Sequence, residues 1–116
     1  MIIKKIDWID ENIKEAEVTV TDGTYEIICF CHPCDYKEGD EVKEVLNCFN
    51  TGLVYISEEE CLVQKQTPPW DYWIVAKVID SKSNLAAVGD IMMNVDIPKD
   101  INNGEFIEFN CTRFDL

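Results

Sequence analysis

The sequence predicts an all-β protein, a small closed or partly open antiparallel β-barrel with little helix. Short runs of β-branched and aromatic residues recur along the chain, and strands favour these residue types. Turn signals rich in Gly, Pro, Asn and Asp separate the runs at intervals of roughly 8–15 residues. About six to eight short strands at that spacing indicate a sheet that closes on itself. A length of 116 residues fits one domain, residues 1–116, with its own hydrophobic core.

Residues 2–9 fit either a strand or a helix. Ile2, Ile6, Ile9 and Ile13 recur at helical spacing, which is typical of an amphipathic helix. The pairs Ile-Ile and Trp-Ile favour a strand instead, and the segment lacks strong helix formers such as Ala and Leu. We predict a strand here.

The clearest strand signal follows. Residues 17–21 alternate polar and apolar side chains, and Asp22-Gly23 is a strong hairpin-turn signal. Residues 25–31 return as the partner strand, which is apolar on both faces and is therefore expected to be covered on both sides. Pro33 cannot donate a ladder hydrogen bond, so it ends this strand. We predict the returning strand to be the buried centre of the fold.

In the middle of the chain the strand signals are shorter and more often interrupted. Residues 42–56 read as two short strands, or as one bent strand interrupted at Gly52. Residues 61–63 suit another short strand. The double proline in residues 67–70 makes a rigid connector that cannot pair regularly. Residues 72–79 are almost continuously apolar and predict a core strand.

The C-terminal part predicts a hairpin and a final strand. A turn at residues 80–84 leads into residues 85–95, which return as one strand with a kink at Gly89. Residues 98–104 are expected to form a loop. Residues 105–114 alternate again and predict the last strand.

The order of these strands resembles a small OB-type barrel. The resemblance rests on the hairpin at Asp22-Gly23, the segment Lys-Glu-Gly-Asp-Glu-Val at residues 37–42 that turns into a strand, and the late hairpin at residues 80–84. It covers most of the chain, but only as an order of strands, without a specific family motif. OB-like domains bind oligonucleotides or oligosaccharides, or serve as protein-interaction modules. The resemblance therefore implies a fold without choosing among these roles.

The net charge of −13 limits the partners. Residues 1–60 hold 15 acids and 5 lysines, while the rest of the chain holds 8 acids and 5 bases. Such a field repels phosphate backbones and acidic membranes and attracts basic proteins. Excess acid also keeps a small domain soluble, so both explanations remain open. Nucleic-acid binding by an OB-type barrel is the weaker alternative, because Arg113 is the only arginine and a basic groove is missing.

The expected location is the cytoplasm. No apolar run approaches the roughly 20 residues that span a bilayer, and no signal-length apolar stretch follows the N-terminal lysines. The reducing cytosol favours free thiols over disulfides for the six cysteines.

Four soft ligands in a short span form the candidate metal site: Cys29, Cys31, His32 and Cys34. Zinc is the metal that such ligands suit, although no second Cys-x-x-Cys is present. Strand alternation also places Cys29 and Cys31 on one face and His32 on the other. The alternative is that the thiols act as small buried hydrophobes. A redox role is not expected, because acidic residues rather than a helix N-terminus follow Cys34.

No catalytic motif is present, so we predict a binding protein rather than an enzyme, and no required cofactor. A rigid loop that presents aromatic residues is a typical binding hot spot, whereas Trp73 is expected to pack inside. The candidate partner-binding residues are Trp70, Tyr72, Glu58, Glu59 and Glu60.

The leading hypothesis is a protein-interaction module for a basic partner. In its sharper form it neutralises that partner, as toxin-immunity proteins and nuclease inhibitors do. The alternative is a barrel that binds a metal or a small ligand through the Cys/His cluster. Oligomeric state stays open, because exposed edge strands can pair.

Overall fold

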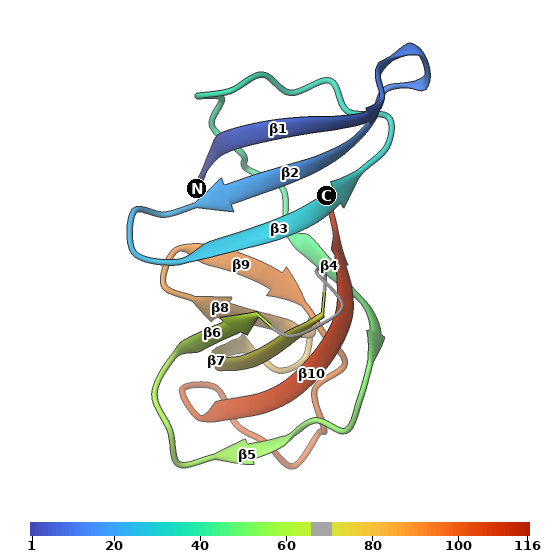
Figure 1. The fold of residues 1–116 in the computed structure, drawn as a ribbon. Helices are drawn as coiled ribbons and strands as arrows, with labels where there is room; N and C mark the ends of the chain where they lie inside the picture. Colours follow the sequence, from blue (N-terminus) through green and yellow to red (C-terminus); the bar gives the residue numbers. More distant parts are fainter. Residues whose placement is uncertain (66–70) are drawn as a thin grey trace.

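The computed structural model describes residues 1–65 and 71–116, and these fold into strands with one short 3-10 helix (Figure 1). The ten strands of the described residues are β1 (Ile2–Asp10), β2 (Glu15–Thr21), β3 (Glu26–Cys31), β4 (Leu46–Thr51), β5 (Tyr55–Ser57), β6 (Leu62–Lys65), β7 (Tyr72–Asp80), β8 (Leu85–Val88), β9 (Ile91–Asn94) and β10 (Phe106–Asp115). The helix, η1 (Glu11–Ile13), lies between β1 and β2. No helix among the described residues has the length and apolar character needed to cross a membrane.

Five strands close into a ring. β10 pairs with β7 along residues 106–111 and with β4 along residues 113–115. β7, β8 and β9 are successive antiparallel neighbours, and β9 lies parallel to β4. The ring order is therefore β4–β10–β7–β8–β9. Three hairpin-connected strands with a fourth that returns beside the first make a Greek key. The predicted all-β barrel is confirmed.

The other long strands extend the sheet beyond the ring. β1, β2 and β3 are antiparallel neighbours, and β3 runs parallel to β10 at Phe114 and Asp115. In Figure 1 the three strands lie together above the ring, and the C-terminal end of β10 reaches them. The predicted central strand is thus β3, which joins the two parts rather than lying in the barrel. Its inward side chains are buried, whereas Ile28 and Phe30 on the other face are only half-buried, so it is not covered on both sides.

Tyr72 ties the two parts together. Its ring meets the Phe114 ring edge-on with centroids 5.9 Å apart, and its hydroxyl accepts a hydrogen bond of 2.9 Å from the Ile28 backbone N–H. The buried apolar residues form one cluster that includes both β1–β3 and the ring, and no polar or charged residue of the described chain is buried. The chain between Pro33 and β4 also pairs with β1, because the Ile3 N–H donates to the Asp40 carbonyl at 2.9 Å.

The middle of the chain forms two short strands, which is one of the two predicted alternatives, whereas one predicted detail of the C-terminal part is wrong. Residues 42–56 contain β4 and β5, which both pair with β10, and the Gly52 N–H donates to the Asn110 carbonyl at 2.9 Å between them. The predicted kink at Gly89 is wrong, because Gly89 and Asp90 form a complete turn between antiparallel β8 and β9. Gly89 has a φ of +58°, which lets two residues reverse the chain. The expected six to eight strands become ten among the described residues, since each interrupted segment supplies two short strands.

Candidate functional site

Partly exposed aromatic side chains gather on the outer face of the sheet. We call this set the aromatic row: Phe30, Phe49, Tyr55 and Trp73, with Arg113 between Phe30 and Phe49. Directly paired residues share a face of a sheet. Phe30 pairs with Asp115 of β10, and Phe49 pairs with Arg113, two residues before Asp115 on the same strand. The aromatic residues come from β3, β4, β5 and β7, all of which pair with β10, and Arg113 comes from β10 itself.

Arg113 is held between two rings. Its guanidinium carbon lies 4.7 Å from the centroid of Phe30 and 4.7 Å from that of Phe49. Asp115 accepts two hydrogen bonds from the same guanidinium, from Nε at 2.7 Å and from Nη2 at 3.2 Å. A fork-shaped contact of this kind fixes the plane of the guanidinium. The stack is thus a preformed platform rather than a set of loose surface side chains.

Tyr55 and Trp73 form the second part of the row. Their ring centroids are 6.4 Å apart and the ring planes meet at 54°. Tyr55 lies opposite Glu108 and Trp73 lies opposite Asn110, so the two rings flank β10 from β5 and β7. Val75 lies opposite Glu108 on this outer face, yet it is only 1% exposed.

A strip of acidic residues on β1 and β2 adjoins the aromatic row. It consists of Asp7, Asp10, Glu15 and Glu17. Asp7 lies directly opposite Glu17, and Asp10 lies directly opposite Glu15. Like charges in directly opposed positions destabilise a sheet, even where Lys5 partly offsets the charge of Asp7 at 3.4 Å. Glu17 in turn lies opposite Phe30, so the strip and the row meet at that pair.

The predicted partner-binding residues are scattered. Tyr72 is 2% exposed and faces inward, whereas its neighbour Trp73, expected inside, lies half-buried on the outer face. Trp70 lies outside the described residues. The acids that follow β5 are exposed, away from the acidic strip in sequence: Glu58, Glu59 and Glu60.

The candidate metal ligands do not converge. Cys29, Cys31 and Cys34 are buried, while His32 is exposed. Within residues 1–65 and 71–116, no three His, Cys, Asp or Glu side chains are placed to hold a metal ion. Burial raises the pKa of the Cys29 thiol well above its usual value. Burial also raises the pKa of Cys31 to about 12, and its hydrogen bond with Cys34 acts in the same direction. Thiols with such pKa values are weak nucleophiles.

Cys48 and Cys111 form a second thiol pair that sequence analysis did not identify. The hydrogen bond between the two thiols, together with burial, raises the pKa of Cys48. Cys111 also donates to the Arg113 carbonyl at 3.1 Å. The two residues come from β4 and β10 and are far apart in sequence, so only the pairing of those strands brings them together.

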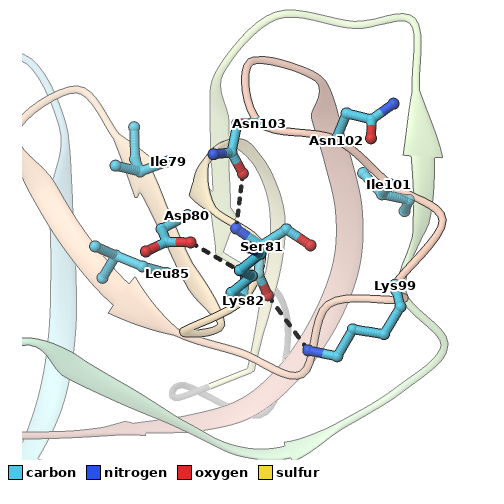
Figure 2. A pocket seen from close by; sticks show the side chains of 9 residues that line it. All are labelled: Ile79, Asp80, Ser81, Lys82, Leu85, Lys99, Ile101, Asn102 and Asn103. Atoms are coloured by element: carbon cyan, nitrogen blue, oxygen red, sulfur yellow. Dashed lines mark hydrogen bonds between the residues drawn. The ribbon is translucent and has the colours of Figure 1, made fainter.

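A cleft lies at one end of the barrel (Figure 2). It is an open hollow of about 1090 Å³ between the β7–β8 turn and the loop before β10. Its polar groups bond to one another: Asn103 Oδ1 accepts from the Ser81 N–H at 2.8 Å, and Lys99 Nζ donates to the Ser81 carbonyl at 3.4 Å. These bonds hold the two loops together. The polar groups of the cleft therefore have a structural role, and we do not assign a ligand to it.

The fold and the outer face define a small all-β barrel protein with an aromatic row beside an acidic strip. No protein-family model, no curated protein and no solved structure matches this chain.

Proposed function

We propose that this protein is an interaction module that binds a basic protein through its outer face. The observation that carries the proposal is the contact between the two surfaces: Phe30, which begins the aromatic row, lies directly opposite Glu17 of the acidic strip. One partner surface can therefore meet aromatic rings and carboxylates together.

The two surfaces supply different parts of the binding free energy. Tyr, Trp and Arg dominate binding hot spots, because they bury large areas with few rotatable bonds. Carboxylates around such a centre steer a basic partner and raise its association rate. The net charge of −13 adds a long-range attraction of the same sign.

An inhibitor that neutralises its partner is the sharper form of the proposal. The two like-charge pairs on β1 and β2 favour it, because a basic surface placed over them would relieve their repulsion. Nucleic acid is a poorer partner, because the acidic strip repels phosphates and the one arginine is engaged by Asp115. The closed Greek-key barrel supports assignment to the OB type, and protein binding is among the roles of that class. We propose a binding protein rather than an enzyme, and the cytoplasm remains the expected location.

The experiment begins with immobilised protein and extract from its own cells. Captured proteins are identified by mass spectrometry, and the best candidate is purified for surface plasmon resonance. We expect a basic partner whose association rate falls at least about tenfold between low and high salt. The double variant Asp7→Asn with Glu15→Gln should lower the association rate, and Phe49→Ala should raise the dissociation rate.

Two choices keep this experiment specific. Asp10 stays unchanged, because its carboxylate accepts from the Asn12 N–H at 3.0 Å and caps η1. Ile79→Ala serves as the control, because Ile79 is an exposed apolar residue that lines the cleft of Figure 2 and is not a member of the aromatic row. Binding that is insensitive to salt and to both sets of variants would overturn the proposal.

A further inference from the structure

We infer that Tyr55, Trp73 and Glu108 form a recognition site for a lysine or arginine side chain of the partner. This inference rests on the proposed function and deepens it. It assigns one part of the aromatic row to one kind of group, an alkylammonium or guanidinium cation.

The ring geometry suits a cation. The two rings are 6.4 Å apart and meet at 54°, so they do not lie flat against each other. Tyr55 is 44% exposed, which leaves its surface available to a ligand. Ring faces carry negative potential and attract cations placed within about 6 Å of the ring centroid. Pairs of aromatic residues that contact one cation are a known recognition device for ammonium groups.

Carboxylates accompany both rings. Glu108 lies directly opposite Tyr55, and its Oε2 accepts a hydrogen bond of 3.0 Å from the Ser57 hydroxyl, which positions it. Asp71 accepts at 3.3 Å from the side-chain amide of Asn110, the residue opposite Trp73. Among the side chains that the structure describes, no ion pair engages Glu108 or Asp71. Their negative charge adds to the attraction that the ring faces exert on a cation.

A hollow adjoins Tyr55, and of the three proposed site residues only Tyr55 lines it. It measures about 440 Å³ and is lined on one side by Tyr55 and Ile56 and on the other by the loop before β10. Two further carboxylates, Asp100 and Glu105, belong to its lining. An aromatic wall with carboxylates around it attracts cations and repels anions. Charge complementarity thus selects a basic side chain as the occupant.

The test uses labelled ten-residue oligoarginine and oligolysine peptides, with an oligocitrulline peptide as the neutral control. Fluorescence anisotropy at low salt should show binding of both basic peptides and none of the citrulline peptide. Tyr55→Leu and Trp73→Leu should each weaken binding about two- to fivefold, as expected for an exposed cation–π contact. Tyr55→Phe and Trp73→Phe should retain binding, because each keeps an aromatic face. Glu108→Gln should weaken it.

Trp8→Leu is the matched control, because Trp8 is similarly exposed but points to the opposite face of the sheet. Equal binding by wild type, Tyr55→Leu and Trp73→Leu overturns the inference, as does failure of the basic peptides to bind. The proposed function survives either result if the purified partner still binds in a salt-dependent manner. If the partner does not bind while the peptides bind and the variants weaken them, the proposed function fails and the cation site stands.

Discussion

The carboxylate of Asp22 lies against Gly89 and binds the turn that contains it, although the two residues are far apart in the sequence. Asp22 belongs to the β2–β3 turn, and its Oδ2 accepts a hydrogen bond of 2.9 Å from the Asp90 N–H in the β8–β9 turn. Its Oδ1 accepts from the N–H groups of Thr24 and Tyr25 at 2.9 and 2.8 Å. One side chain therefore shapes its own turn and also fastens the three-stranded extension to the barrel.

Gly89→Ala should lower the free energy of unfolding by about 2 kcal/mol or more. A φ of +58° costs a non-glycine residue about 1–2 kcal/mol, and an added Cβ would collide with Asp22 Oδ2. Urea denaturation measures the change. In an Asp22→Ala background the collision with the carboxylate disappears and a close contact with the Tyr25 ring remains, so the same substitution should cost less. An equal cost in both backgrounds would show that the two turns are not coupled.

Asp22 also predicts a dependence of stability on pH. Burial acts to raise the pKa of its carboxyl, but the N–H donors of Tyr25, Asp90 and Thr24 outweigh burial and leave the pKa below its usual value of 3.8. A lowered folded-state pKa stabilises the protein above the unfolded-state pKa near 4, and the stability is lost as pH falls through the folded value. The stability difference between wild type and Asp22→Asn should therefore shrink below about pH 4. Denaturation series at several pH values test this, and a constant difference would contradict it.

Tyr72→Phe should destabilise the protein without weakening partner binding. The substitution leaves the Ile28 N–H without its acceptor, and an unsatisfied donor of this kind costs about 1–3 kcal/mol. Tyr25→Phe is the control, because the Tyr25 hydroxyl donates a longer bond of 3.3 Å to the Cys61 carbonyl, and both hydroxyls lie at part-buried sites. Denaturation and partner binding are measured on both variants. Equal stability losses would mean that the Tyr72 hydroxyl has no special joining role.

Cys31 should resist alkylation in the folded protein. With a pKa of about 12, only about one thiol in ten thousand is ionised at pH 8, and the thiolate is the reactive form. Cys61, which is only half-buried, should react first. Iodoacetamide labelling followed by peptide mass spectrometry gives the order, and labelling in urea gives the unfolded control. Cys31 reacting as fast as Cys61 would contradict the burial that the structure shows.

Local patterns were sufficient for much of the fold. The Asp22-Gly23 turn, the core strand β7 and the turn after it form where turn residues and a continuous apolar run predict them. Such features depend on residues that are close in sequence, so a short stretch of the chain is enough to predict them. The turn at Gly89 was not predicted, because it needs only two residues and is stabilised by Asp22, which is far away in the sequence.

The candidate site could not be predicted from local patterns. Its members come from several strands, and period-two alternation shows which side chains share a face without showing which face is inward. Tyr72 and Trp73 illustrate this, because either could have filled the core; pairing with β10 placed Cys111 opposite Tyr72 on the inside and Asn110 opposite Trp73 on the outside. The sequence by itself determined an acidic, all-β chain with its main turns. Only the tertiary structure decided which aromatic residues lie together beside the carboxylates, because strand register is set by long-range pairing.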